Sequence, residues 1–257
     1  FSFTAHATDA FRDPAALRAS LVACSFCVTS CEYVRRHLAS VSPASVAKLE
    51  VLTDAVDLDR FARERTYDPD GPIVAVARLV PKKGLDDLVR AAARAGSREV
   101  LIAGAGPERQ RLENLIAETR APVRLLGRMP NREVRALVEG AALFALPCVV
   151  APDGDRDGIP VAIMEAMALE VPVLATREVG IPEAVDADRG RLVAPGDPAA
   201  LAGAIEELLA LDPGDREAMG RAGREWVSQH ADRRRQARQL RDWIVATGYH
   251  GVSDSEL

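Results

Sequence analysis

The chain has 257 residues, of which 48% are hydrophobic, and it carries a formal net charge of −5 at pH 7. This size allows one large domain or two smaller ones with a substantial core. The acidic balance gives no general nucleic-acid footprint, and no apolar run is long enough to cross a bilayer. No secretory signal is visible, and Phe1 stands where an initiator Met would, so we expect a processed or truncated piece.

The first part of the chain predicts short strands alternating with helices. Strands are expected at residues 1–5, 26–29 and 46–52. Helices are expected between them, at residues 14–22 and 32–39. His6 then lies at the carboxyl end of the first strand. Residues 67–72 are rich in turn formers, and we interpret them as a linker.

A second and longer series of strands and helices follows this linker. Short apolar strands are predicted at residues 73–77, 100–103, 123–126, 142–146, 171–175 and 191–193. Helices are predicted at residues 83–95, 107–118, 132–139, 161–168 and 198–210, with a mostly helical tail over 215–246. Asp197 and Pro198 are an N-cap and a first helical residue for one of them. Buried strands alternating with helices are typical of a doubly wound parallel sheet, so we predict an α/β fold.

Three of the four cysteines, Cys24, Cys27 and Cys31, lie close together in the sequence. Their spacing allows a zinc or redox site. The segment that holds them reads as a strand, however, and no second pair of ligands is nearby. We therefore predict buried free thiols, which pack as small apolar side chains.

Two acids, Asp157 and Glu165, have seven residues between them in the most informative stretch of the chain. The helix predicted after Pro160 surrounds Glu165 with apolar residues, where an unpaired charge is costly. We expect this carboxylate to find its partner in a ligand, and sugar hydroxyls suit it. The turn at Gly158 and Ile159 offers free backbone N–H groups at the helix N-terminus, which predicts an anion site.

A calcium site is the alternative interpretation of this stretch. Asp153, Asp155 and Asp157 followed by Gly158 imitate the opening of a calcium-binding loop. Such a loop needs a bidentate glutamate at its twelfth position, where this chain has Met164. We expect no metal site, and we interpret Asp153 and Asp155 as a solvated acidic loop.

Cations follow the first strand of the second series. Ligands bind beyond the carboxyl ends of the strands in such sheets, where Arg78 and Lys83 are expected to lie. Together they could hold a diphosphate, although exposed loop cations are the alternative.

A glycine-rich turn and a histidine complete the candidates. The turn from Gly104 to Gly106 resembles the start of a dinucleotide fingerprint, but Arg109 replaces its third glycine. This predicts a close backbone approach to a ligand at Gly106 more than a nicotinamide site. His6 is either an active-site residue or an ordinary polar residue at a strand end.

Four motifs in order resemble the family 4 retaining glycosyltransferases of the GT-B type. They are Arg78-Leu-Val-Pro-Lys-Lys-Gly84, Ala103-Gly-Ala-Gly-Pro-Glu108, Leu126-Gly-Arg-Met-Pro130 and Asp157-x7-Glu165-Ala-Met167. The first acid of the last motif is usually glutamate in that family, and Asp157 is one methylene shorter. The resemblance covers nearly the whole chain and implies two Rossmann-like domains with the site in the cleft between them.

The resemblance also implies domain limits. Residues 1–60 match the end of an acceptor-binding domain, whose larger part would lie upstream. Residues 61–235 match the nucleotide-sugar-binding domain, and residues 236–257 match a helix that crosses back to the first domain, with a tail. With the acceptor side incomplete, we expect this chain alone to bind the donor but to transfer little sugar.

Residue roles follow from the same resemblance. Arg78 and Lys83 would stabilise the leaving diphosphate, with help from the N–H groups of Gly158 and Ile159. The remaining roles are ribose binding by Glu165, donor-sugar contact by Asp157, base contact by Gly127 and Arg128, and sugar contact or acceptor orientation by His6. The reaction would move a sugar, with retention and without a metal or other cofactor, from a nucleotide diphospho-sugar to a glycan or lipid-linked acceptor.

Partners and rival functions are implied in the same way. Cell-surface polysaccharide biosynthesis is the expected process, in the cytoplasm and at the inner face of the membrane, with any membrane contact through the absent domain. Five arginines of the tail, Arg233, Arg234, Arg235, Arg238 and Arg241, are interpreted as a solvated or domain-facing surface and not a nucleic-acid site. The rivals are a nucleotide-sugar epimerase on the same fold and a non-catalytic nucleotide-sugar-binding module.

Overall fold

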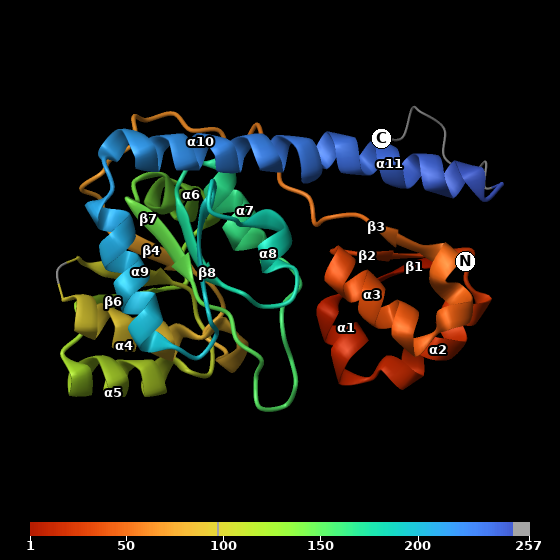
Figure 1. Ribbon diagram of the computed structural model, residues 1–257, viewed down its shortest axis with the longest axis horizontal. Helices are drawn as coiled ribbons and strands as arrows, with labels where there is room; N and C mark the ends of the chain where they lie inside the picture. Colours follow the sequence, from red (N-terminus) through yellow and green to blue (C-terminus); the bar gives the residue numbers. More distant parts are fainter. Residues whose placement is uncertain (97, 249–257) are drawn as a thin grey trace.

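The computed structural model describes residues 1–96 and 98–248 and contains two parallel β-sheets with helices around them (Figure 1). The smaller sheet has the order β1-β2-β3, and the larger has the order β6-β5-β4-β7-β8-β9. Every strand pair in both sheets is parallel. The predicted α/β, Rossmann-like fold is confirmed. We call the two parts the small unit and the large unit.

The small unit contains the first three strands of the chain. Its strands are β1 (Ser2–Ala5), β2 (Phe26–Thr29) and β3 (Leu49–Val51). Its helices are α1 (Ala7–Arg12), α2 (Pro14–Ala23) and α3 (Glu32–Val41). Helix α1 was not predicted, because six residues are too few to show a helical period. Asp9 Oδ2 stabilises its start by accepting from the backbone N–H of His6 at 3.0 Å.

The predicted strand over residues 46–52 is wrong at its beginning. Residues Pro43–Lys48 form the 3₁₀ helix η1, and the strand covers only Leu49–Val51. Proline at the first position sets a helical φ, and the Ser45 N–H donates to the Ser42 carbonyl at 2.9 Å. Local turn chemistry therefore outweighs the apolar pattern there.

The large unit holds the remaining strands and most helices. Its strands are β4 (Ile73–Val76), β5 (Val100–Ala103), β6 (Val123–Gly127), β7 (Leu143–Leu146), β8 (Val173–Thr176) and β9 (Gly190–Val193). Its helices are α4 (Leu85–Ala95), α5 (Arg109–Thr119), α6 (Asn131–Glu139), α7 (Val161–Ala168), α8 (Ile181–Ala184), α9 (Pro198–Ala210) and α10 (Pro213–His230). The central strands β5, β7 and β8 are buried throughout, since helices cover both faces of a doubly wound sheet.

The helix predicted from residue 83 begins two residues later, and the difference shapes the site. Residues Pro81–Lys83 form the 3₁₀ helix η2, which Gly84 ends with a left-handed φ of +60°. A Cβ at Gly84 would lie 1.9 Å from the Pro147 carbonyl oxygen, so only glycine fits. The tight turn directs two adjacent lysines toward the carboxyl edge of the sheet.

The long helices at the end of the chain connect the two units. Figure 1 shows α10 along the large unit and α11 (Arg233–Ala246) continuing over the small unit. Trp243 of α11 lies with its ring 6.3 Å from the ring of Phe26 in β2. Residues 249–257 of the predicted tail lie outside the described residues. No helix in the described part of the chain is long and apolar enough to cross a membrane.

The stretch predicted as a linker is packed against the large unit. The Tyr67 hydroxyl donates to the Ala142 carbonyl at 2.7 Å, and Arg216 donates to the Pro69 carbonyl at 3.1 Å. A Cβ at Gly71 would lie 2.2 Å from the Gly140 carbonyl oxygen. Turn-forming residues therefore mark an ordered segment here and not a free connection.

Loops at the carboxyl edges of the two sheets meet directly. The Glu183 carboxylate accepts hydrogen bonds from the backbone N–H groups of Glu32 at 2.9 Å and Tyr33 at 2.8 Å. It thus caps helix α3 of the small unit from the large unit. Gly180 is also in contact, since a Cβ there would lie 2.6 Å from Cys31 Sγ.

Replacement of Glu183 by alanine should lower the free energy of unfolding by about 1–2 kcal/mol, the usual loss for a helix cap. Two backbone donors of α3 would lose their partner. Urea denaturation followed by circular dichroism measures the change. Glu206→Ala, on the exposed face of α9, is the matched control and should change little. Equal effects of the two substitutions would contradict the capping role.

All four cysteines are buried and free, which confirms the prediction for Cys24, Cys27 and Cys31. Burial raises the pKa of Cys27 to about 12 and the pKa of Cys31 to about 11. Burial also raises the pKa of Cys148, with the nearby Asp157 charge adding to the effect. No group of metal-binding side chains is found among the residues that the structure describes.

The thiols of Cys27, Cys31 and Cys148 in the folded protein should therefore react with a disulfide reagent at pH 8 on the order of a hundredfold more slowly than those of the unfolded chain, because only the thiolate attacks. A pKa raised to about 11 or 12 leaves far less thiolate at pH 8 than the ordinary cysteine pKa of about 8.5. Absorbance of the released aromatic thiol measures the rate, with urea-unfolded protein as the reference. Fast labelling of one cysteine in native protein would contradict its burial.

Candidate functional site

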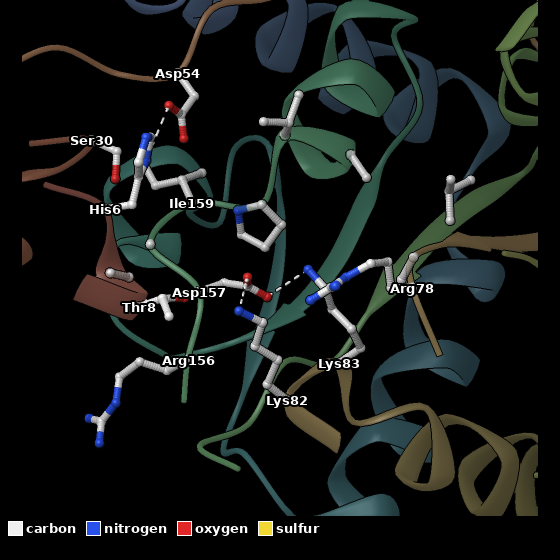
Figure 2. A pocket seen from close by; sticks show the side chains of 17 residues that line it. His6, Thr8, Ser30, Asp54, Arg78, Lys82, Lys83, Arg156, Asp157 and Ile159 are labelled. Carbon is white, nitrogen blue, oxygen red and sulfur yellow. Dashed lines mark hydrogen bonds and ion pairs between the residues drawn. The ribbon is translucent and has the colours of Figure 1, made fainter. Parts of the chain in front are cut away.

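A cavity of about 350 Å³ lies between the small and large units at the carboxyl ends of their strands (Figure 2). The small unit contributes His6, which directly follows β1, and the large unit contributes Arg78, which follows β4. Ligands of doubly wound sheets bind at this edge. The cavity brings together six predicted site residues: His6, Arg78, Lys83, Asp157, Gly158 and Ile159.

The Asp157 carboxylate lies between two lysines. Lys83 Nζ is 2.6 Å from Asp157 Oδ2, and Lys82 Nζ is 3.2 Å from Asp157 Oδ1. The buried Cys148 thiol contacts the same carboxylate, with Sγ 3.7 Å from Oδ2. These contacts hold Asp157 in one position against the cavity.

Lys82 was missed by the sequence analysis, although its side chain lines the cavity and is 7% exposed as a residue. The signal was present in the sequence, because Lys82 and Lys83 are adjacent before Gly84. Neighbouring residues of a 3₁₀ helix point about 120° apart, so it is the length of the lysine side chains that lets both ammonium groups reach Asp157 from η2. Two neighbours in the sequence thereby form a pair of cations at one carboxylate.

Arg78 differs from the lysines in having no partner among the residues that the structure describes. It is exposed in the cavity, and its guanidinium makes no hydrogen bond or ion pair with any described residue. A guanidinium offers planar, bidentate binding to phosphate. Arg78 is therefore available to an anion that enters the cavity.

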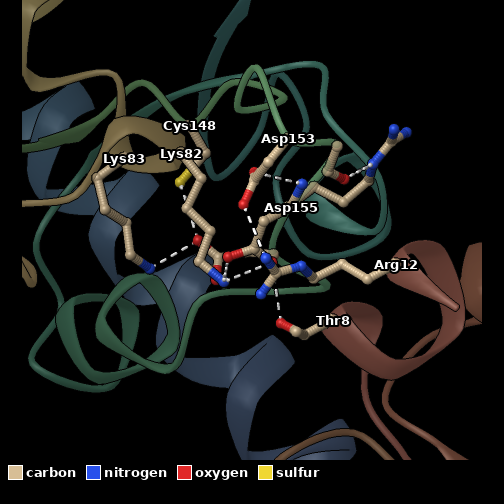
Figure 3. A network of polar contacts seen from close by, with 10 residues as sticks. Thr8, Arg12, Lys82, Lys83, Cys148, Asp153 and Asp155 are labelled. Atoms are coloured by element: carbon tan, nitrogen blue, oxygen red, sulfur yellow. Dashed lines mark hydrogen bonds and ion pairs between the residues drawn. The ribbon is translucent and has the colours of Figure 1, made fainter.

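The acidic loop before Gly158 is anchored and not merely solvated, so the sequence interpretation of Asp155 is wrong (Figure 3). Asp155 accepts from Thr8 Oγ1 at 3.0 Å and lies 3.2 Å from Lys82 Nζ. Burial alone raises the pKa of the Asp155 carboxyl, but the hydrogen bonds from Lys82 and Thr8 outweigh it and lower the pKa. Asp153 is more exposed and pairs with Arg12 at 3.0 Å. Tertiary contacts across the cleft, which the sequence could not show, order this loop.

Two backbone N–H groups face the cavity just before α7. No described residue accepts a hydrogen bond from the N–H of Gly158 or Ile159. A Cβ at Gly158 would lie 2.7 Å from Ser30 Oγ, so glycine lets this turn approach β2 of the small unit. The free donors at a helix N-terminus favour an anion in the same cavity as Arg78.

Asp54 also lines the cavity and was not predicted. Its Oδ1 lies 4.0 Å from Nδ1 of His6. Burial raises the pKa of the Asp54 carboxyl, and a charge on His6 acts to lower it. Asp54 is an acidic residue soon after β3, and strand ends meet at the carboxyl edge of a parallel sheet. Its position after the strand was the signal in the sequence that could have identified it.

Four predicted site residues lie outside the lining of this cavity: Glu165, Gly106, Gly127 and Arg128. Glu165 is partly buried on α7, and burial raises the pKa of its carboxyl while Arg60 lowers it. Among the described residues its carboxylate has no hydrogen bond or ion pair, which leaves it available to a ligand.

The glycines among these four have conformational or packing explanations. A Cβ at Gly106 would lie 2.3 Å from the Leu79 carbonyl oxygen, so close packing of two loops accounts for this glycine. Gly127 ends β6 with a φ of +75°, and Arg128 follows it on the surface. Both loops stand at the carboxyl edge of the large sheet, where β5 neighbours β4, the strand that leads to Arg78, and β6 follows on the other side of β5.

Comparisons with known proteins agree with this arrangement. The family model for glycosyl transferases group 1 matches residues 59–226. A protein of Salmonella typhimurium named as a candidate colanic acid biosynthesis glycosyltransferase is 37% identical over 202 residues, which are 75% of this chain and 50% of that protein. A GDP-mannose-dependent alpha-(1-6)-phosphatidylinositol monomannoside mannosyltransferase of Mycolicibacterium smegmatis is 37% identical over 213 residues, 76% of this chain and 55% of that protein.

The chain spans about half the length of these curated relatives. The fold is also that of solved glycosyltransferase-type structures. Sucrose-phosphate synthase from Thermosynechococcus elongatus matches with a TM-score of 0.84 and 23% identity, over 96% of this chain and 67% of that one. Because the family model covers most of the chain, this protein belongs to the group 1 glycosyl transferases.

Proposed function

We propose that this chain is the donor-binding part of a glycosyltransferase that takes its sugar from a nucleotide diphospho-sugar. The observation that carries the proposal is the anion site in the cavity. It combines the unpaired Arg78 guanidinium, Lys83 and the free N–H groups of Gly158 and Ile159. Family membership supports sugar transfer, and the GDP-mannose dependence in the name of one relative supports this class of donor.

The cations act where negative charge develops. When the bond between the anomeric carbon and the diphosphate breaks, the bonding electrons stay on the phosphate oxygen. Arg78 and Lys83 stabilise this charge, and the N-terminus of α7 adds its dipole. Groups held in place by the fold stabilise it without reorganisation, which is the main advantage of a preorganised site.

We assign Asp157 and His6, which both line the cavity, to the sugar of the donor. The two lysines leave part of the Asp157 carboxylate facing the cavity, and we assign it to hydroxyl groups of the donor sugar. His6 stands on the opposite, small-unit side, where it contacts the sugar or orients the acceptor. Retention at the anomeric carbon is part of the proposal and rests on the sequence resemblance.

The nucleoside would extend along the carboxyl edge of the large sheet. Glu165, whose carboxylate lacks a partner in the described part of the chain, binds the ribose hydroxyls. We assign Gly127 and Arg128, at the end of β6, to the base. Gly106 packs on Leu79, and we propose that its loop lies next to the ligand.

The acceptor is assigned by class only. The relatives are named for colanic acid biosynthesis and for a phosphatidylinositol mannoside, a polysaccharide and a glycolipid. We therefore propose a glycan or lipid-linked acceptor in polysaccharide or glycolipid biosynthesis. We propose that the reaction takes place in the cytoplasm, at the inner face of the membrane when the acceptor is lipid-linked.

Arg78→Ala and Lys83→Ala should each weaken binding of a nucleoside diphosphate by about 1.5–3 kcal/mol, because each removes charge-assisted hydrogen bonds. Binding of the nucleoside should change far less. Calorimetry with UDP, GDP, ADP and their nucleosides measures both. Arg94→Ala, an exposed arginine at the end of α4, is the matched control and should leave affinity unchanged. Equal losses for nucleoside and diphosphate would contradict the phosphate assignment.

Binding of the nucleoside diphosphate should not require a divalent metal, because protein cations occupy the position where the phosphate charge lies. The Asp155 and Asp157 carboxylates are also paired with lysines. Chelator should leave the calorimetric affinity nearly unchanged. A large loss that manganese or calcium restores would favour a metal site at the acidic loop.

A further inference from the structure

Lys82 is a buried cation that is paired with two carboxylates and also lines the cavity. Its side chain is 9% exposed, and its ammonium lies 3.2 Å from Asp155 Oδ2 and 3.2 Å from Asp157 Oδ1. Lysine is seldom buried to this degree unless its charge is paired. It also lines the cavity beside Lys83 and Arg78, whereas Asp155 does not line it.

The charges of this cluster nearly cancel. Two lysines, Lys82 and Lys83, face two carboxylates, Asp155 and Asp157, and Arg78 adds one unpaired positive charge. A diphosphate that carries two or more negative charges is therefore not neutralised by the cluster as it stands. An ammonium has three N–H donors, so Lys82 can keep its contact with Asp157 while the donors that now face Asp155 Oδ1 and Oδ2, both at 3.2 Å, turn to a further acceptor.

Lys82 is paired with two carboxylates, and Asp155 is the one it can release while the sugar contact assigned to Asp157 is kept. Asp155 does not line the cavity, and it also accepts from Thr8 Oγ1 at 3.0 Å (Figure 3). Thr8 belongs to α1 of the small unit, so Asp155 keeps a hydrogen bond when Lys82 turns toward an anion. Asp157, in contrast, is held by both lysines and faces the cavity.

We propose that Lys82 is a third phosphate-binding residue for the diphosphate of the donor, and that Asp155 weakens this binding by neutralising Lys82. The proposal rests on the function proposed above. It makes the affinity for the diphosphate depend on an acid that does not touch the ligand. Asp155 then acts on the ligand through Lys82 and is a positioning residue.

The two residues must therefore have opposite effects. Lys82→Met removes a positive charge from the cavity and should weaken nucleoside diphosphate binding by about tenfold or more, the usual scale of a charge-assisted hydrogen bond. Asp155→Asn removes the competing negative charge, keeps an acceptor for Thr8, and should strengthen binding by a few fold. If the ion pair only supported the loop, both substitutions would weaken binding.

The experiment is calorimetry of UDP, GDP and the two nucleosides with wild type, Lys82→Met, Lys82→Arg and Asp155→Asn at one ionic strength. Asp153→Asn is the matched control, because Asp153 lies on the same loop and pairs with the exposed Arg12. It should leave affinity unchanged. Nucleoside affinity should be the same in all variants, and Lys82→Arg should keep most of the diphosphate affinity because it keeps the charge.

Unchanged diphosphate affinity in Lys82→Met, or weaker binding in Asp155→Asn, would overturn the inference. Should Lys82→Met fail to fold, the sign of the Asp155→Asn effect decides the question, because that substitution leaves the buried lysine paired with Asp157. Failure of the wild-type chain to bind any nucleoside diphosphate would instead reject the proposed function itself. Wild-type binding that Lys82→Met does not weaken rejects only the role of Lys82.

Discussion

The site depends on the ion pairs that hold Asp157 between Lys82 and Lys83. Charges with so little exposure are costly to remove from water, and their mutual attraction returns this cost only with good geometry. Such pairs are weak evidence for stability. Their position at the carboxyl edge of a parallel sheet, beside an unpaired arginine, points instead to a ligand that changes the charge balance.

The cleft exists because the loops of the two units are tied together at its edges. Glu183 caps α3 from the opposite unit, Gly180 packs on Cys31, and Thr8 bonds to Asp155. Arg156 adds a further contact, since its guanidinium lies 4.6 Å from the centre of the Phe11 ring. These contacts join a small sheet, which offers His6 and Asp54, to a large one, which offers the cations. Neither unit alone encloses the cavity.

The small unit contributes fewer charged side chains to the cavity than the large unit does. Its contacts nevertheless determine which part of the large unit is covered. Ser30 directly follows its strand β2, and Gly158 packs against it so closely that a Cβ there would meet Ser30 Oγ at 2.7 Å. Gly158 and Ile159, whose N–H groups have no acceptor among the described residues, thereby line the cavity at the start of α7. Small residues at this contact therefore bring the start of α7 to the cavity that we propose as the anion site.

The sequence alone determined the α/β class, most of the strands and helices, and Arg78, Lys83 and Asp157 as members of one site. Buried strands and capped helices have local periods, and parallel topology brings strand ends to one edge. Only the tertiary structure decided that Lys82 joins the site, that Asp155 is anchored and that Asp54 faces His6. Those facts depend on the left-handed turn at Gly84 and on contacts between residues that are far apart in the sequence. Lys82 and Asp155, for example, are separated by 73 positions. No local pattern in the sequence encodes such contacts.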